Sequence, residues 1–278
     1  MARSTRPSGR ARTSGVELLP AGTYSLARGI PDAPEGTLFV LGDRGGIRVE
    51  PETRFEVVFG RNEPDVHVCL GTDDPGISRR HGLLSWDPRG WSLRNTGVIP
   101  IRFPGSRLLL SGHEEPLSST YTPLFIRTEP KREHLLEVRV VGRSGAGAKA
   151  KVDDSTRRPT TWQLTDRERI VLTALGHRYL RHEPHPQPES WANTAKELEV
   201  LQPDADWTNK KAEHVVLGVR NRLTDSGVPG LTRNEVGEPS GNVINHNLLF
   251  ELLLSTSLVP PDLRLLDRSA SPDPRSPA

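Results

Sequence analysis

A segment rich in Gly, Ser, Lys, Arg and Pro, residues 142–160, divides the chain into two parts whose apolar residues repeat with different periods. Before this segment, apolar residues often occupy every second position, as Val66, Val68 and Leu70 do. After it, the apolar residues between 212 and 223 recur at spacings of three and four. A period of two predicts β-strands, and a period near 3.6 predicts helices. The chain should therefore fold as a multidomain protein, all-β in its first part and mainly α in its second.

The two ends of the chain share the composition of the dividing segment. Residues 1–14 carry four Arg and no acidic residue, and residues 268–278 are mostly Ser, Pro and Arg. Such segments bury too little apolar surface to offset the entropy that they lose on ordering. We therefore expect a disordered basic tail at 1–14, a β-sandwich at 15–141, a flexible basic linker at 142–160, a helical domain at 161–267 and a disordered tail at 268–278.

Turn residues separate the β-type segments of the first part. Residues 87–90 read Asp-Pro-Arg-Gly, which suits a type I turn and predicts a hairpin between segments 82–86 and 91–93. The other predicted strands are residues 37–41, 46–50, 55–59, 65–70, 99–103, 107–110, 123–127 and 134–141. A series of short strands in one domain predicts a β-sandwich.

Helix start and stop signals organise the second part. Thr165 and Glu168 form a capping box before the first predicted helix, and the prolines between 184 and 188 forbid its continuation. The predicted elements that follow are a helix at 191–200, a helix at 208–223, a β-hairpin at 231–244 and a helix at 245–254. Three helices, a hairpin and a further helix indicate a winged-helix-like domain.

Short motifs in the first part fall at predicted strand ends and loops. Phe-Gly-Arg at 59–61 is followed, seventeen residues after its Arg, by Ser-Arg-Arg-His at 78–81, and a hairpin strand then carries Asn95. With this spacing the chain resembles the forkhead-associated (FHA) family over roughly a third of its length. The resemblance implies an FHA-type β-sandwich that binds a phosphothreonine on a partner protein. The high Arg and Pro content with few Lys is typical of GC-rich genomes, so we expect a bacterial, actinobacterial type of FHA protein.

The motif residues have the chemistry that a phosphate receptor needs. A phosphorylated side chain brings ~1.5 to 2 negative charges and three acceptor oxygens, so its receptor must offer fixed donors. Arg61 is always charged, and its bond to a phosphate is worth on the order of 1.5 to 3 kcal/mol. The resemblance implies that the Ser78 hydroxyl also donates to the phosphate, that Arg79 assists, and that His81 braces the loops from behind. Gly60 is expected to let the loop turn.

The sequence departs from the family at the Asn-Gly pair that usually holds the peptide backbone. In a strict alignment, Ile99 and Pro100 stand in place of that pair, and one peptide contact is missing. If the loop is shortened, Asn95 or Thr96 takes over the contact, and we expect Asn95 to do so.

Nearby acidic residues offer a different interpretation of the basic ones. Arg61 and the two arginines at 79 and 80 would then pair with Asp65, Asp73 and Asp74 on the sandwich surface, without any phosphate. In this alternative the protein is a phosphorylation-independent scaffold, whose winged helix mediates protein–protein contacts or dimerisation.

Basic residues gather at both ends of the third predicted helix. If this helix entered a major groove, the contacts to DNA would come from Asn209, Lys210, Lys211, Arg220, Arg222 and, on the wing, Arg233. Residues 161–267 nevertheless hold eleven basic against fifteen acidic residues, which disfavours strong nonspecific binding. DNA binding and protein docking therefore both remain predictions for this domain.

Composition disfavours other functional classes. Cys69 is the only cysteine, so the chain lacks a disulfide or a thiolate metal site, and we expect a cytoplasmic protein without cofactor or metal. No segment reaches the ~20 apolar residues of a membrane helix. Prolines break the cluster of His177, His182, Glu183 and His185, so we expect a solvated loop there. Without a catalytic arrangement, the prediction is an adaptor, not an enzyme, whose partners are a serine/threonine kinase or its phosphorylated substrate.

Overall fold

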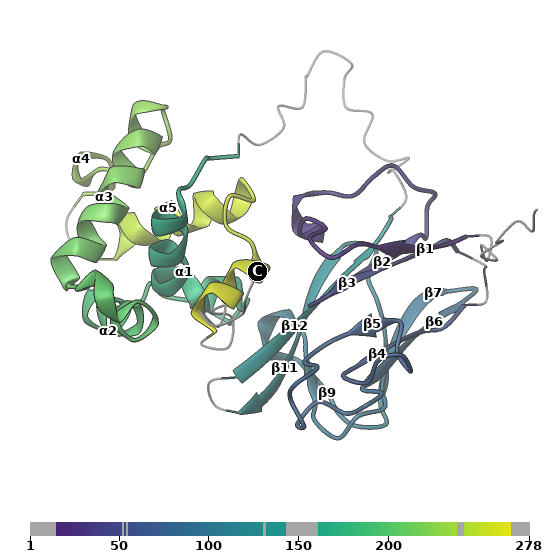
Figure 1. The fold of residues 1–278 in the computed structure, drawn as a ribbon. Helices are drawn as coiled ribbons and strands as arrows, with labels where there is room; N and C mark the ends of the chain where they lie inside the picture. The colour runs from purple at the N-terminus through teal and green to yellow at the C-terminus, as the bar shows by residue number, and fades with distance from the viewer. Residues whose placement is uncertain are drawn as a thin grey trace, which may run out of the picture.

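The computed structural model describes residues 15–142 and 161–267, except 52, 54, 130, 131 and 238–241. The expected tails at 1–14 and 268–278, and the expected linker apart from Gly142, lie outside the described residues. A β-rich part and a helical part lie beside each other (Figure 1). Within the described segments, no helix has both the length and the apolar character required to cross a lipid bilayer.

The first part is a sandwich of two sheets. One sheet has the order β1 (Val16–Leu19), β3 (Gly45–Val49), β2 (Leu38–Gly42), β12 (Arg132–Val140), β11 (Tyr121–Glu129), β8 (Ile101–Arg102) and β9 (Leu108–Leu109). The other has the order β10 (Glu114–Pro116), β7 (Gly90–Asn95), β6 (Gly82–Asp87), β4 (Val57–Gly60) and β5 (Val68–Cys69). Strands β4 and β5 are parallel, which places the loops that follow them at the same end of the sheet.

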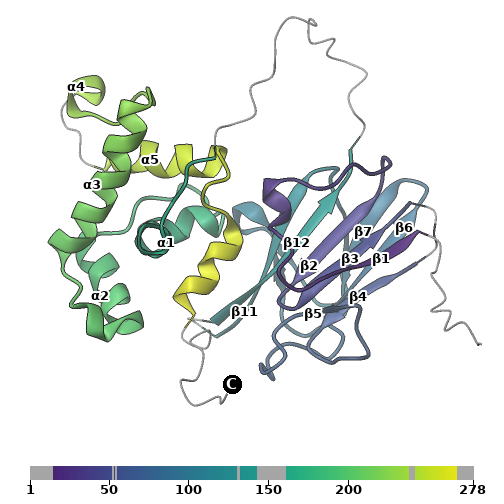
Figure 2. The same ribbon diagram turned by 45° about the horizontal axis from the view of Figure 1, so that its top comes forward.

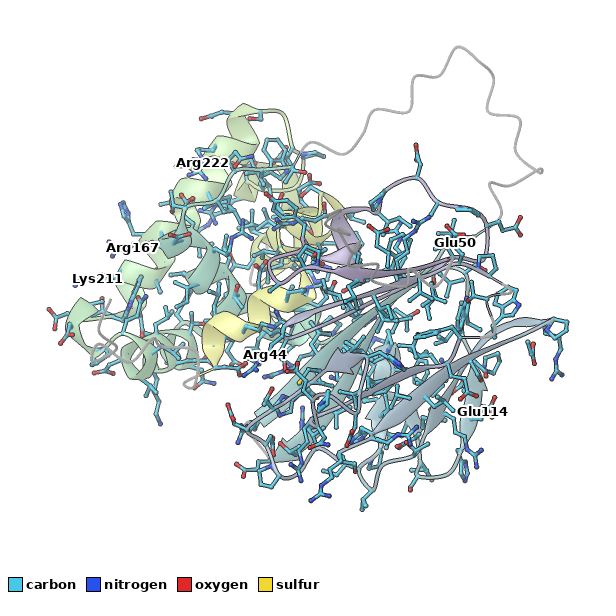
Figure 3. All side chains as sticks on the ribbon, turned by 45° about the vertical axis from the view of Figure 1, so that its right-hand side comes forward. Arg44, Glu50, Glu114, Arg167, Lys211 and Arg222 are labelled. Atoms are coloured by element: carbon cyan, nitrogen blue, oxygen red, sulfur yellow. The ribbon has the colours of Figure 1, made fainter. Side chains whose placement is uncertain are left out.

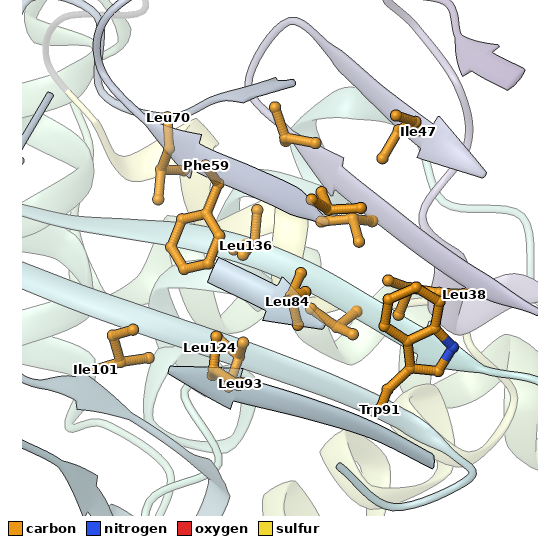
Figure 4. Close-up of a cluster of buried hydrophobic side chains, with 14 of the residues drawn as sticks. Leu38, Ile47, Phe59, Leu70, Leu84, Trp91, Leu93, Ile101, Leu124 and Leu136 are labelled. Atoms are coloured by element: carbon orange, nitrogen blue, oxygen red, sulfur yellow. The ribbon is translucent and has the colours of Figure 1, made fainter. Parts of the chain in front are cut away.

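Alternating apolar side chains from both sheets fill the space between them (Figure 4). In β7, for example, Trp91 and Leu93 point inward while Arg94 points to solvent. The Trp91 indole N–H donates to the Gly36 carbonyl at 2.7 Å, so its polar atom is satisfied although the ring is buried. Burying each such side chain stabilises the fold by about 1.5 to 3 kcal/mol.

The predicted strands recur in the structure with shifted ends. The predicted hairpin is confirmed: Asp87 pairs with Gly90, and the Asp87 carboxylate accepts the Arg89 N–H at 2.7 Å. Strands β1 and β10 were not predicted, because both are short edge strands with mixed exposure and little apolar alternation.

The second part is mainly helical, with α1 (Asp166–Leu180), α2 (Trp191–Leu201) and α3 (Asn209–Asp225) packed around one apolar cluster. The predicted capping box is confirmed: Glu168 N–H donates to the Thr165 hydroxyl at 3.2 Å, and the Glu168 carboxylate accepts the Thr165 N–H at 2.9 Å. Thr208 caps α3 as predicted, since its hydroxyl accepts the Lys211 N–H at 3.2 Å.

The predicted β-hairpin at 231–244, the wing of the winged helix, is wrong. Residues Arg233–Val236 form the short helix α4, and Val243–Leu254 form α5, so the described part of this segment contains no strand. The Glu235 carboxylate accepts both the N–H and the hydroxyl of Thr232, at 3.0 and 2.7 Å, which starts a helical turn. Asn245, the expected cap, lies inside α5.

Contacts join the two parts at the β11–β12 side of the sandwich. The Gly105 N–H donates to the His182 carbonyl at 2.9 Å, and Arg102 Nη1 donates to the Arg181 carbonyl at 2.9 Å. The loop expected to be solvated therefore packs, through His182, against the sandwich. The C-terminal 3-10 helix η4 (Pro260–Leu266) also lies against β11 and β12 in both views (Figures 1 and 2).

Candidate functional site

Arg61 follows β4 directly and is fixed beside the loop that carries Ser78. We call residues 71–81 the phosphate loop, after the phosphate contact that the motif resemblance implies for Ser78. The Arg61 backbone N–H donates to the Ser78 carbonyl at 3.2 Å, and Arg61 Nε donates to the Ile77 carbonyl at 2.8 Å. The Arg61 side chain is half-buried. The structure thus brings the Arg61 guanidinium and the Ser78 loop together, although they lie far apart in sequence.

The guanidinium of Arg61 is not neutralised by a neighbouring acid. Among the described residues, no carboxylate lies within 4.0 Å of Arg61 or of the exposed arginines at 79 and 80. Asp65 instead accepts a hydrogen bond from Asn62, and Asp74 pairs with residues of β12. The alternative in which these arginines pair with surface acids is therefore contradicted for the part of the chain described.

The Ser78 hydroxyl is placed to donate a hydrogen bond. Its oxygen accepts the Val98 N–H at 3.3 Å, which occupies a lone pair and leaves the hydroxyl proton free. The Ser78 N–H is held by His81 Nδ1 at 3.2 Å. The loop backbone is therefore fixed while the side chain remains half-exposed.

His81 lies wholly inside the protein, behind the phosphate loop. Its Nδ1 accepts the Ser78 N–H, and its Nε2 lies 3.0 Å from the Ile99 carbonyl, which can only accept. Nε2 therefore carries the proton, and the ring is neutral. Burial lowers the pKa of His81, which agrees with a neutral ring. The imidazole joins two loops and faces away from solvent, where a bracing residue would lie.

Gly60 is required for a reason other than the expected turn. Its φ is not in the left-handed region, but an added Cβ would come within 2.4 Å of the Arg79 carbonyl oxygen and 2.8 Å of that of Ser78. Glycine is needed here because the phosphate loop passes so close over β4 that no side chain fits at this position.

Asn95, the expected peptide contact, is buried and cannot reach a ligand. Its side chain is 0% exposed; Nδ2 donates to the carbonyls of Ile99 and Leu109 at 3.0 Å each, and Oδ1 accepts the Gly97 N–H at 2.9 Å. The expectation for Asn95 is therefore corrected. Thr96, the other candidate, is exposed, and its hydroxyl donates to the Arg80 carbonyl at 3.2 Å.

Asp74 supports the phosphate loop, a role that is absent from the sequence-based expectations. Its Oδ1 accepts the Gly76 N–H at 2.8 Å, and its Oδ2 accepts the Thr128 hydroxyl and faces His134 Nε2, both at 2.6 Å. Burial raises the pKa of Asp74, but these bonds and Arg132 outweigh it and bring the pKa below its usual value. The Asp-Pro-Gly sequence at 74–76 is typical of a turn whose Asp side chain accepts a backbone N–H two residues later. This pattern is the sequence signal that indicates the role of Asp74.

The basic residues predicted to contact DNA differ in the contacts that they already make. Lys211 Nζ donates to the Ala205 carbonyl at 3.3 Å. Lys210 and Lys211 are exposed at the start of α3 and line a groove together with Arg167 and His214. Arg222 forms an ion pair with Glu168, with Nη2–Oε2 at 3.1 Å. Figure 3 labels Lys211 and Arg222, both on α3, and Arg167, which belongs to α1.

The other three predicted contacts also lie on the surface of the helical part. Asn209 is exposed at the first position of α3, and Arg220 is half-buried in a second groove. Arg233, expected on a wing, is an exposed residue of α4 in that second groove. Lys210 also lines this second groove and thus belongs to both grooves, whereas Arg222 lines neither.

Comparison with known proteins finds FHA domains among solved structures only. No protein-family model matches the chain, and no curated protein matches it. An engineered FHA domain with a Myc-pTBD peptide is 17% identical, with a TM-score of 0.33, over 38% of this chain and 93% of that one. FHA-1 of Rv1747 from Mycobacterium tuberculosis is 20% identical, with a TM-score of 0.31, over 39% and 99%. The N-terminal FHA domain of Rad53p from S. cerevisiae, in complex with a phosphothreonine peptide, is 14% identical, with a TM-score of 0.32, over 37% and 93%.

Proposed function

We propose that the β-sandwich binds a phosphothreonine on a partner protein, with Arg61 and the Ser78 hydroxyl as the phosphate donors. One observation carries the proposal: the Arg61 side chain is bonded to the Ile77 carbonyl beside Ser78, yet no described carboxylate neutralises it. A charged guanidinium that is held in place but lacks a counter-ion is suited to bind an anion.

The phosphate would sit between residues of two loops. Arg61 supplies charge, Ser78 supplies a free hydroxyl proton, and the exposed Arg79 adds a second positive charge. Thr96 lies beside the same loop and is the surface residue available to contact the peptide after the phosphothreonine. Because His81 and Asp74 hold the loop from behind, little ordering entropy remains to be lost on binding.

We further propose that the protein acts as an adaptor and not as an enzyme. A serine/threonine kinase would create the phosphothreonine, and the sandwich would bind the kinase itself or its substrate. A kinase-made ligand and a single cysteine both favour the cytoplasm. The motif resemblance supports phosphothreonine over other phosphorylated residues. The helical part would then carry the consequence of binding to a second partner.

The proposed function predicts selective capture of phosphothreonine peptides. A library with a fixed phosphothreonine and randomised flanks, measured by fluorescence anisotropy, should bind more tightly than its unphosphorylated counterpart. Arg61→Ala should weaken binding on the order of 10- to 100-fold, because a charge-assisted bond is lost. Arg89→Ala removes an exposed arginine from the β6–β7 turn and should bind as the wild type does. Equal binding of both libraries would refute the proposal.

Nucleic-acid binding by the helical part is a second candidate. The groove that Lys210, Lys211, Arg167 and His214 line supports it, because these side chains face one surface; Glu168 is the acidic residue of the same lining. Arg222 is committed to Glu168, and the domain carries more acidic than basic residues, so we propose weak contact with phosphates.

This second candidate is tested by salt dependence. Binding to a short duplex DNA should weaken steeply as salt rises from 50 to 200 mM, roughly in proportion to the phosphates neutralised. The double variant Lys210→Ala and Lys211→Ala should reduce that slope by about two, whereas Lys196→Ala on α2 should leave it unchanged. Affinity that does not respond to salt would leave protein docking as the role of the helical part.

A further inference from the structure

The phosphate loop is held at its first residue by Asp43, which follows β2. Asp43 Oδ2 accepts the Gly71 N–H at 2.7 Å, and the Asp43 N–H donates to the Cys69 carbonyl at 3.2 Å. Gly71 has a φ of +62°, and an added Cβ would lie 2.9 Å from both the His134 ring and the Ile77 side chain. The path of the loop after Gly71 therefore depends on how Asp43 holds this one N–H.

A residue of the helical part holds Asp43 in turn. Arg264 belongs to η4, and its Nη2 lies 3.3 Å from Asp43 Oδ1 and 3.3 Å from the Gly42 carbonyl oxygen. Asp43 thus uses one carboxylate oxygen for the phosphate loop and the other for the helical part. Figures 1 and 2 both show this C-terminal segment, in yellow, beside the sandwich.

Two neighbouring residues of β12 make a second connection between the same two regions. His134 faces Asp74 of the phosphate loop at 2.6 Å. The residue before it, Glu133, forms an ion pair with Arg181, the C-terminal cap of α1, at 3.3 Å. The helical part therefore reaches the loop that presents Ser78 by two separate routes.

We propose that Asp43 and Arg264 are positioning residues for the phosphate loop, so that docking of the C-terminal 3-10 helix raises the affinity of the sandwich for a phosphothreonine peptide. The inference rests on the function proposed above. Neither residue is proposed to touch the ligand. Asp43 acts through the Gly71 N–H, and Arg264 acts through Asp43. By linkage, a bound phosphopeptide stabilises the docked helix to the same extent.

The test measures the Kd of the tightest phosphothreonine peptide from the library by titration calorimetry on full-length variants. Arg264→Ala should bind roughly threefold more weakly, because a partly exposed ion pair is lost. Asp43→Ala should bind about tenfold more weakly, because the Gly71 N–H also loses its acceptor. Arg264→Lys keeps a charged donor and should recover part of the loss. Lys196→Ala, an equal charge change at an exposed position of α2, should bind as the wild type does.

Hydrogen exchange of the free protein gives a second measurement that needs no ligand. In Arg264→Ala, the amides between 71 and 78 should exchange several-fold faster, while those of α3 keep their wild-type rates. A wild-type Kd together with wild-type exchange in Arg264→Ala and Asp43→Ala would overturn the inference and leave the proposed function intact. A wild-type protein that binds no phosphothreonine peptide would instead defeat the proposed function, and the inference with it.

Discussion

The residues around the phosphate loop are of two kinds: some have donors at the surface, and others are buried and hold the loop in place. Arg61 and Ser78 keep donors available at the surface, whereas His81 and Asn95 are wholly buried and fully hydrogen-bonded. Residue type alone does not separate these roles, because Asn is as suitable for binding a peptide backbone as for closing a buried loop.

Asn95 should therefore matter for stability first. Asn95→Ala would leave the Ile99 and Leu109 carbonyls and the Gly97 N–H without their partner, and should lower the free energy of unfolding by about 3 kcal/mol. Urea unfolding measures this loss. Arg94→Ala, at the exposed preceding position, should change it little. If Asn95→Ala kept wild-type stability and lost only peptide affinity, its assignment as a structural residue would be wrong.

At the scale of elements, the start of α1 is also its link to α3. Glu168 closes the capping box with Thr165 and pairs with Arg222, so one carboxylate caps one helix and holds a second. Burial raises the pKa of Glu168, but its bonds from Arg222 and Thr165 outweigh burial and bring the pKa below the usual value. The charged carboxylate is thus favoured in the folded state.

The lowered pKa of Glu168 predicts a dependence of stability on pH. Its contribution is complete above the unfolded-state pKa of about 4.3 and is lost as the pH falls through the lower folded-state value. The free energy of unfolding of the wild type should therefore decrease more steeply between about pH 5 and pH 3 than that of Glu168→Gln. Urea unfolding at several pH values compares them. Glu199→Gln, at an exposed position of α2, should keep the wild-type slope.

At the scale of the whole molecule, one buried carboxylate organises the contact between the two parts. Glu133 lies 3.1 Å from Arg102, 3.5 Å from Arg127 and 3.3 Å from Arg181, and its side chain is 7% exposed. Arg181 comes from the helical part, and the other two arginines come from the sandwich. Without Glu133, three positive charges would face one another at the contact.

Glu133→Gln should loosen this contact. Removing one partner of a buried ion pair leaves uncompensated charge, which should lower the free energy of unfolding by about 3 kcal/mol. Urea unfolding, followed by tryptophan fluorescence, should show the helical part unfolding at lower denaturant than in the wild type. Glu129→Gln, an exposed change on the adjacent strand, is the matched control. Coincident curves for both variants and the wild type would show that the contact contributes little.

The sequence by itself determined the local elements and the residues of the motif. Alternation predicted the strands of the sandwich, and caps such as Thr165 and Thr208 predicted the starts of α1 and α3. These signals suffice because strands and helix caps depend on residues close in sequence. The error at 231–244 is also local: Thr232 and Glu235 form a capping box there, and a capping box predicts the start of a helix and not a β-hairpin.

Only the tertiary structure decided which motif residues face solvent and which connect the two parts. The buried Asn95 side chain donates a hydrogen bond to the Leu109 carbonyl, fourteen residues away in sequence. Gly60 is required because the backbone of Arg79 passes directly over it. Arg264 reaches Asp43 across more than half of the chain. These contacts join residues distant in sequence, so neither periodicity nor local spacing carries information about them.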